Sequence, residues 1–353
     1  MEYFDRERLA SKPAEELITL GIESSCDETA AAVLRGGRGL LADVISTQVP
    51  IHRKFGGVVP EIASRNHILN VLPVVDEAIK QAGLKLADID QIAVTCGPGL
   101  VGALLVGVAA AKSLAWSLEV PLIGVNHLEG HIFANFLSSP DLTPPFVALV
   151  ASGGHTALVN VLDYDRFRLL GQTRDDAAGE AFDKVARVMG LPYPGGPEID
   201  RLSKEGNPQA IDFPKALARD GYEFSFSGLK SAVLNYLNSQ KLKNIPVHKA
   251  DVAASFQQAV IAILVEKSLA ALRETGLDTL ALAGGVAANS ALAAELRRAT
   301  GEAGYKFYFP NRRLCTDNAA MIACRGYYQS LTDNYEHNDL TLNAVPGLSL
   351  SDR

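Results

Sequence analysis

The chain has 353 residues, of which 48% are hydrophobic and 21% charged, and its formal net charge is −7 at pH 7. This length allows two domains of ordinary size, and the composition is typical of a globular chain that buries a core. The acidic balance excludes a surface coated in Lys and Arg, so binding to a nucleic acid would need a local basic patch or a partner.

The segment before Leu20 is polar and carries charges of both signs. It lacks the apolar centre of a secretory signal, so we expect residues 1–18 to form a flexible leader of a cytoplasmic protein. No stretch offers about eighteen uninterrupted apolar residues, since the nearest one, residues 102–118, contains Lys112. We therefore expect no membrane contact.

The apolar pattern predicts three strands in hairpin order from about residue 19, a helix over 60–83, a strand over 89–96 and an apolar helix to about Leu118. After "SSPDLTPP" the same order starts again, with strands at 279–285 and 305–310 among later helices. This repetition predicts an α/β fold of two similar lobes, residues 19–140 and 141–333, around a cleft. The polar residues 334–353 predict a poorly ordered tail.

The stretch "VNHLEGHIFA" places His127 and His131 four residues apart. On a helix both imidazoles share one face and can reach one cation, although an ordinary histidine pair is equally compatible with the spacing. A zinc peptidase of the HExxH type needs its glutamate beside the first histidine. Here Glu129 points about 200° away from His127 on a helix, which argues against that enzyme class.

A third metal ligand must come from elsewhere, and Asp317 in "LCTDNAAMIA" is the best candidate. The last clear helix is expected to begin there, and capping that helix is the ordinary role of such a residue. Two histidines and one carboxylate leave positions open for a substrate oxygen. That set suits one divalent ion, iron(II) or zinc.

In "GIESSCDET" a sharp turn after the first predicted strand brings Glu23, Asp27 and Glu28 close together. Acids in such a turn are often simply solvated. In a cleft they can instead orient a nucleophile or take its proton.

Two stretches place paired glycines after a predicted strand: "VASGGHT" contains Gly153 and Gly154, and "LAGGVAANS" leads to Asn289. Glycines let backbone N–H groups approach a phosphate, and Asn289 can bond a ribose or base as it opens a helix. Asp183 and Asp200 can each accept two hydroxyl groups of a ribose. Each feature by itself is more often structural than functional.

Together these stretches closely resemble one family, the universal tRNA threonylcarbamoyladenosine transferases, formerly described as O-sialoglycoprotein endopeptidases. The resemblance covers nearly everything from Leu20 to about Tyr328 and resembles the bacterial or organellar branch. It rests on ten motifs in order: "GIESSCDET", "GGVVPEIASRNH", "GPGLVGALLVG", "NHLEGH", "ASGGHT", "DDAAGEAFDK", "YPGGPEID", "FSFSGLK", "GGVAANS" and "CTDNAAMIA".

The resemblance implies a two-lobed actin, sugar-kinase and Hsp70-like fold with a central nucleotide cleft. It implies a metal held at the positions of His127, His131 and Asp317, and an activity that depends on the acids at Asp27 and Glu28. The nucleotide part of the substrate would contact the following positions: Val150, Ala151, Ser152, Gly153, Gly154, Asp183, Gly196, Asp200 and Asn289.

The implied reaction moves a threonylcarbamoyl group from threonylcarbamoyl-AMP to the exocyclic amine of the adenosine next to the anticodon, in tRNAs that read codons starting with A. The implied partners are an inactive paralogous subunit and a small P-loop ATPase. We expect the first to dock near "VLPVVDEAI" and "GALLVGVAAAKSLAW". A candidate RNA-facing patch consists of Arg53, Lys54, Arg65, Arg312 and Arg313.

Two other functions stay open at this stage. A metal-dependent glycoprotein endopeptidase needs a general base beside the histidines. A kinase of the same fold would want an aspartate, and not Glu23, in its first phosphate turn.

Overall fold

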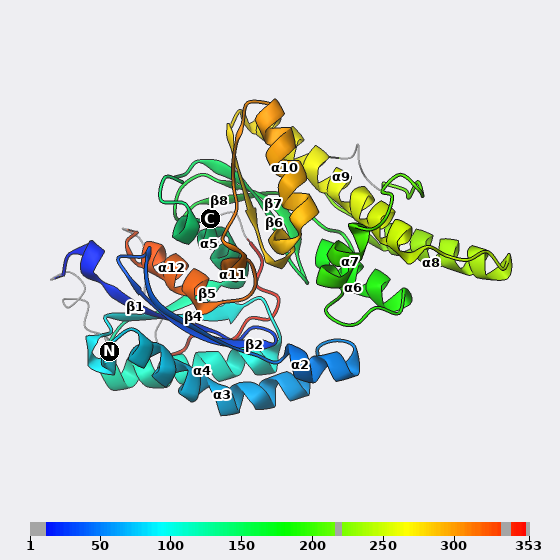
Figure 1. The fold of residues 1–353 in the computed structure, drawn as a ribbon. Coiled ribbons are helices and arrows are strands. Elements are labelled where there is room, and N and C mark those ends of the chain that lie inside the picture. The colour runs from blue at the N-terminus through cyan, green and yellow to red at the C-terminus, as the bar shows by residue number, and fades with distance from the viewer. Residues whose placement is uncertain (1–11, 216–220, 333–339, 351–353) are drawn as a thin grey trace.

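The computed structural model describes residues 12–215, 221–332 and 340–350, and Figure 1 shows its two sheets with helices around them. The first sheet has the strand order β3-β2-β1-β4-β5. β1 pairs antiparallel with β2 and parallel with β4, and β4 pairs parallel with β5, so three strands end at one edge. The strands are β1 (Ile18–Glu23), β2 (Glu28–Arg35), β3 (Gly39–Thr47), β4 (Gln91–Gly97) and β5 (Leu122–Asn126).

The second sheet repeats this topology, with the order β10-β9-β6-β7-β8. β6 pairs antiparallel with β7 and parallel with β9, which pairs parallel with β10. This repeat confirms the predicted α/β fold of two similar lobes. The strands are β6 (Phe146–Ala151), β7 (Thr156–Val161), β8 (Phe167–Gln172), β9 (Thr279–Ala283) and β10 (Lys306–Tyr308).

Helices cover both sheets, and their apolar faces form the cores. α3 and α4 pack on one face of the first sheet, below it in Figure 1, whereas α6, α9 and α10 pack on the outer face of the second. The longer helices are α3 (Pro60–Gln81), α4 (Val101–Leu118), α5 (His127–Ser138), α6 (Ala178–Val188), α7 (Gly195–Ser203), α8 (Ser227–Leu242), α9 (Lys249–Thr275), α10 (Ser290–Glu302) and α12 (Ala319–Ser330). Short turns are η1 (Ala14–Glu16), α2 (Val49–His52), η2 (Arg53–Phe55), η3 (Leu86–Asp88), η4 (Gly285–Ala288) and α11 (Arg312–Cys315).

Helices α5 and α12 form a layer between the two sheets. A Cβ at Gly21 of β1 would overlap the Ala319 carbonyl, and one at Gly326 of α12 would overlap the Ala93 side chain. The absence of these two side chains lets α12 lie directly on the first sheet. The sequence placed this helix in the expected second lobe, residues 141–333, but it packs against the sheet of the first.

Residues 340–350 lie along the edge of the first sheet. The Val345 N–H donates to the Cys96 carbonyl at 2.7 Å, and the Asn126 amide donates to the Ser349 carbonyl at 3.1 Å. These residues therefore depart from the expected poorly ordered tail, because strand-end carbonyls and apolar pockets hold them. Residues 1–11 of the expected leader, residue 333 of the expected second lobe, and residues 334–339 and 351–353 of the expected tail lie outside the described residues.

Two helices, α4 and α9, are long and apolar enough to cross a membrane by length and composition alone. In α9 the apolar stretch is 78% buried, which is explained by its position inside the second core. In α4 the corresponding value is 33%, because only one face packs against β4 and β5. Packing within the described residues does not explain the apolar side chains on the other face of α4.

We expect Gly326→Ala to destabilise the chain by about 1–3 kcal/mol, because the added methyl group overlaps β4 and forces α12 off the sheet. Gly301→Ala in α10 is the matched control, since open space surrounds that position and alanine is favoured in helices by up to about 1 kcal/mol. Urea unfolding of both variants measures the difference. Equal midpoints would contradict the close packing of α12.

Candidate metal centre and nucleotide cleft

The polar residues of the first lobe gather where its parallel strands end. β1 ends at Glu23, β4 at Gly97, and β5 at Asn126, whose side chain accepts the Leu128 N–H at 2.9 Å and caps α5. α5 therefore begins at His127. The carboxyl edge of a parallel sheet is where open α/β folds place ligands.

His127, His131 and Asp317 come together at this edge. Asp317 Oδ1 lies 3.4 Å from His127 Nε2 and 3.2 Å from His131 Nε2, and the imidazole centroids are 4.6 Å apart. All three candidate ligand atoms lie within 4.8 Å of one another. The structure thus brings together two helical histidines and an acid that follows His131 by 186 residues in the chain.

His131 indicates that this group fits a cation. Its side chain is fully buried, and neither ring nitrogen has a well-directed hydrogen bond within the described part of the chain, despite the short approach to Asp317. Buried polar atoms normally have partners. A divalent ion among two imidazoles and a carboxylate would satisfy these nitrogens, and iron and zinc both accept such donors.

Glu23 orients the first imidazole. Its Oε2 lies 3.0 Å from His127 Nδ1 and accepts the Thr95 hydroxyl at 2.6 Å, while its Oε1 accepts the Ser25 N–H at 2.5 Å. A carboxylate at Nδ1 favours the tautomer with its proton there, which directs the lone pair of Nε2 toward Asp317. The sequence offered no signal for this pairing, because Glu23 and His127 are 104 residues apart.

Opposite charges shift the pKa values of His127 and Asp317. Burial alone would lower the pKa of His127, but the carboxylates of Glu23 and Asp317 outweigh it and hold that pKa well above its usual value. Burial alone would raise the pKa of Asp317, and the two imidazoles outweigh it and hold that pKa far below its usual range. The acid of the group is therefore ionised throughout the neutral range.

Glu129 faces away from the metal candidates. Its Oε2 accepts Arg325 Nε at 2.6 Å, and both side chains are buried. It cannot act as a general base at the histidines, as the helical geometry had indicated. The peptidase function thereby loses the residue it requires.

Asp27 ends the turn between β1 and β2, and Glu28 is the first residue of β2. Burial and, in smaller part, the neighbouring Asp27 raise the pKa of Glu28 to about 10, although the Thr47 hydroxyl, which donates at 3.0 Å, opposes the shift. Glu28 therefore carries a proton near neutral pH. Burial, and more weakly the charge of Asp27, also raise the pKa of Asp183 in α6.

Two glycine turns of the second lobe lie side by side because β6 and β9 are neighbouring parallel strands. Val150 and Ala151 are buried in β6, and Ser152 closes the turn by donating its N–H to the His155 carbonyl at 2.8 Å. Gly153 and Gly154 are exposed, with open space where a Cβ would stand. Ala151 in turn contacts Gly284 of the second turn, so both turns open at one edge.

The other expected nucleotide contacts surround these turns. Asp183 accepts the Gly195 N–H at 2.7 Å, and Gly196 is the next residue of α7. Asp200 accepts the Ser290 hydroxyl at 3.0 Å. Asn289 caps α10 by accepting the Leu292 N–H at 2.9 Å and donates to Gln257 at 2.7 Å, so its amide is already engaged.

A cavity of about 400 Å³ opens beside Asp200 and Asn289. Arg297, Phe309 and Arg312 form much of its remaining wall, and the Arg297 guanidinium lies 5.2 Å from the Phe309 ring centroid. Acidic, cationic and aromatic groups thus share one recess at the second lobe.

Two further features went unnoticed in the sequence. His155 follows the first glycine turn, and burial, followed by the charges of His127 and His131, lowers its pKa to about 4, so its imidazole is neutral near pH 7. At the rim, Arg53 of the first lobe donates to the Tyr193 carbonyl of the second at 2.9 Å.

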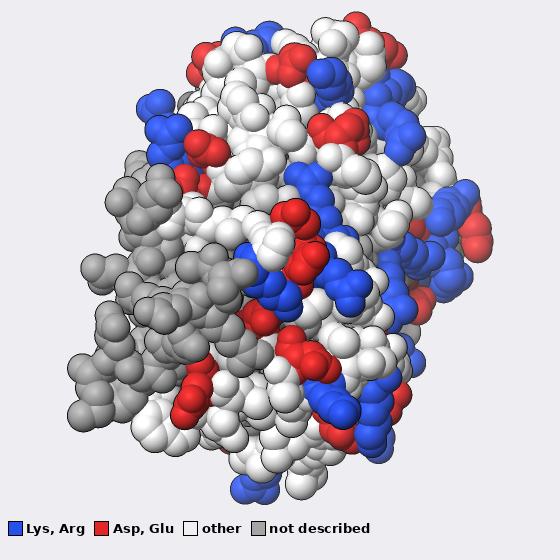
Figure 2. Space-filling view, turned by 90° about the vertical axis from the view of Figure 1, so that its left-hand side faces the viewer, with Lys and Arg blue, Asp and Glu red and all other residues white. Residues whose placement is uncertain are grey.

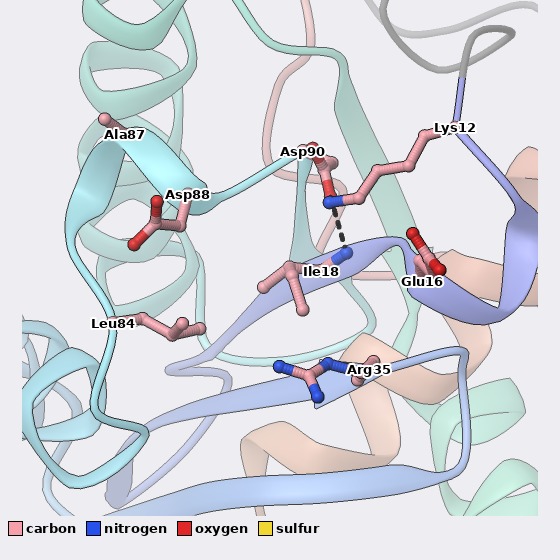
Figure 3. A pocket seen from close by; sticks show the side chains of 8 residues that line it. All are labelled: Lys12, Glu16, Ile18, Arg35, Leu84, Ala87, Asp88 and Asp90. Carbon is pink, nitrogen blue, oxygen red and sulfur yellow. Dashed lines mark hydrogen bonds and ion pairs between the residues drawn. The ribbon is translucent and has the colours of Figure 1, made fainter.

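Another cavity, of about 480 Å³, lies at the opposite end of β1 (Figure 3). Figure 3 shows Lys12 directed at Asp90, which accepts its ammonium group at 2.6 Å and the Ile18 N–H at 2.8 Å. Ile18 begins β1 and Glu23 ends it, so this cavity is separated from the metal candidates by the length of the strand. Residues of the expected leader and of the first sheet line this cavity.

Comparisons with known proteins identify the family of the chain. The family model described as tRNA N6-adenosine threonylcarbamoyltransferase matches residues 39–324. The chain belongs to this family. A relative of that name from Clostridioides difficile (strain 630) is 56% identical over 337 residues, which cover 95% of this chain and 99% of the relative. Another, from Moorella thermoacetica, is 59% identical over 339 residues, covering 96% and 98%.

Solved structures agree on the fold alone. Full-length HypF in its phosphate- and nucleotide-bound form is 14% identical with a TM-score of 0.60, over 88% of this chain and 46% of that one. HypF of T. kodakarensis is 15% identical with a TM-score of 0.61, over 90% and 48%. The expected family, its transferase class and the two-lobed actin, sugar-kinase and Hsp70-like fold are thus confirmed.

We expect His131→Ala to lower the metal content of protein purified without added metal salts, because one of three donors is lost. His248→Ala is the control, since that exposed histidine only pairs with Asp251 at 3.1 Å on the surface. Elemental analysis by mass spectrometry measures both. Unchanged metal stoichiometry in His131→Ala would refute the ligand assignment.

Proposed function

We propose that the chain transfers the threonylcarbamoyl group of threonylcarbamoyl-AMP to the exocyclic amine of the adenosine next to the anticodon, in tRNAs that read codons starting with A. The observations that carry the proposal are the two-histidine, one-aspartate cluster and the acidic residues at the carboxyl edge of the first sheet, and the paired glycine turns that follow β6 and β9 in the second. Membership of the transferase family supports it.

The second lobe would hold the AMP part of the donor. Its phosphate would lie against the turn from Val150 to Gly154, where exposed glycines offer backbone N–H groups. The ribose and base would lie toward Asp183, Gly196, Asp200 and Asn289, beside the cavity of about 400 Å³. Because the Asn289 amide already caps α10, it would contribute through its remaining lone pair.

His127, His131 and Asp317 would hold one divalent ion, iron(II) or zinc. When bound there, such an ion would offset negative charge on a phosphate or carbonyl oxygen of the donor. Glu23 would keep His127 in the ligating tautomer throughout.

The acceptor amine is a weak nucleophile, because its lone pair is delocalised into the adenine ring. Positioning must therefore supply much of the acceleration. As the amine nitrogen bonds to the carbamoyl carbon, the bond from that carbon to the phosphate oxygen breaks and AMP leaves as an anion. Asp27 would accept the amine proton, while Glu28, already protonated, would donate a hydrogen bond within the pair.

Two competing functions find less support. The endopeptidase lacks a base, because Glu129 is engaged by Arg325 at 2.6 Å. For the kinase, Glu23 occupies the place of the expected aspartate, and its carboxylate is already bonded to His127, Thr95 and Ser25.

The RNA contact must be local, since the chain is acidic and the face in Figure 2 mixes Lys and Arg with Asp and Glu. Of the five expected cations, Arg53 donates to Tyr193 and Arg313 pairs with Asp43 at 3.3 Å. Arg312 lines the cavity, which makes it the best placed to meet an anticodon loop.

The exposed face of α3 and α4 is the proposed docking surface for the inactive paralogous subunit. Its large apolar side chains are between 45% and 70% exposed, which is typical of an interaction site. The small P-loop ATPase would join the same complex, and a protein that works on tRNA would act in the cytoplasm, without membrane contact. The apolar residues of the docking surface are Ile68, Leu69, Leu72, Val101 and Leu105.

We expect Asp27→Asn to lower kcat by about 10²–10⁴, because it removes the proton acceptor. Glu28→Gln should cost less, since glutamine preserves the neutral, hydrogen-bonding state of the native residue. The assay supplies the protein and its partners with unmodified tRNA, threonine, bicarbonate, ATP and the adenylate-forming enzyme, and detects the modified nucleoside by mass spectrometry. No product and no AMP from the wild-type chain would refute the proposed function, and equal losses in both variants would refute the division of roles.

We expect Leu69→Asp to abolish co-purification with the paralogous subunit, because a charge replaces a side chain that is 70% exposed at the centre of the docking surface. Leu242→Asp on α8 is the control, as that leucine is 85% exposed but lies in the other lobe. Size-exclusion chromatography of the mixed subunits measures the complex. Retention of the complex by Leu69→Asp would rule out this surface.

A further inference from the structure

Helix α12 and the residues before it cross α5 along one stripe. Met321 and Arg325 lie four residues apart on α12 and share a face of that helix, and Asp317 lies in the segment that leads into it. Asp317 meets His127 and His131, Met321 approaches Gly130, and Arg325 bonds to Glu129. Residues of the motif "HLEGH" therefore contact α12 and the segment before it at three successive levels along the helix. The contact of Asp317 with the two histidines is the first level.

The second level depends on the lack of a side chain at Gly130. A Cβ there would stand 2.7 Å from Ile322 Cδ1 and 3.4 Å from Met321 Cγ. The glycine thus lets the two helices approach closely. A small rotation of α5 would therefore change both the contact of Asp317 with the histidines and the Glu129–Arg325 pair.

The third level is a buried ion pair. Arg325 Nε donates to Glu129 Oε2 at 2.6 Å, and the two side chains are 1% and 4% exposed. The guanidinium lies 5.0 Å from the Phe133 ring centroid and 5.2 Å from that of Phe167. In these apolar surroundings the pair is poorly screened, so its geometry strongly constrains the two helices.

We propose that the Glu129–Arg325 pair positions the metal ligands, by fixing the rotation of α5 against α12 and thereby the separation of the two histidines from Asp317. α12 is itself fixed, because Gly21 and Gly326 leave it in direct contact with the first sheet. The inference rests on the metal centre of the proposed function and not on the reaction. Glu129 and Arg325 are positioning residues, since neither touches the ligand cluster.

The test uses the full-length, metal-free protein with Zn²⁺ and Co²⁺ as probes. Glu129→Gln should weaken Zn²⁺ binding about 10- to 100-fold in a chelator competition and alter the visible absorption of bound Co²⁺, because the ligands shift. Glu129→Asp retains the charge on a shorter side chain and should weaken Zn²⁺ binding in the same direction, which keeps the test open if the first variant folds poorly. Tyr328→Phe is the control, because it removes only the hydrogen bond of 2.5 Å from Arg38 to α12.

A double variant, Glu129→Leu with Arg325→Met, separates positioning from stability. Apolar replacement of a buried ion pair often preserves stability, so its melting temperature should recover relative to Glu129→Gln. The Zn²⁺ affinity should stay low, since the directional contact is gone. Recovery of both quantities would overturn the inference, because the pair would then contribute stability alone.

His131→Ala, measured in the same chelator competition, distinguishes failure of the positioning role from failure of the metal centre. If His131→Ala loses Zn²⁺ binding while Glu129→Gln and Glu129→Asp retain it, the positioning role is refuted and the metal centre stands. If all three variants bind Zn²⁺ as the native chain does, the metal centre is refuted as well.

Discussion

The structure depends on the direct contact of α12 with the first sheet. Gly21 in β1 and Gly326 in α12 have no room for a side chain, so the helix lies against the backbone of the strands. This contact fixes Asp317, two residues before the helix, relative to the carboxyl edge of β1, β4 and β5. Because α5 starts at that same edge, one packing constraint sets the positions of both halves of the metal group.

The carboxyl edge of the first sheet gathers carboxylates that would repel one another if all were ionised and unpaired. The structure relieves the repulsion in a different way for each. Glu23 is bonded to His127, Thr95 and Ser25, and Asp317 is approached by two imidazoles. Glu28 instead retains its proton, with a pKa of about 10. Buried charge is expensive unless compensated, so this division allows several carboxylates to lie near one another in a folded chain.

Sequence reasoning succeeded where the signal was local. The repeated order of strands and helices predicted the two lobes, and the 3.6-residue period alone showed that Glu129 could not face the same way as His127. It could not find the partner of Glu129, because Arg325 lies 196 residues away. It also assigned α12 by chain order to the second lobe, and treated residues 340–350 as a loose tail, since neither helix period nor polarity reveals which sheet a returning segment meets.

Helices α3 and α4 carry the proposed docking surface on their outer faces and contact the residues around the acidic turn on their inner faces. On α3, His67 directly precedes the exposed Ile68 and Leu69, yet its ring is buried. One ring nitrogen lies 2.8 Å from the Thr29 hydroxyl and the other 3.0 Å from the Cys26 carbonyl. On α4, the Ala103 carbonyl accepts the Ser24 hydroxyl at 3.0 Å. The backbone on both sides of Asp27 and Glu28 is therefore held by the two helices whose outer faces are apolar and exposed. A subunit that covers those faces would limit the motion of α3 and α4, and with it the freedom of the turn that carries the proposed proton acceptor.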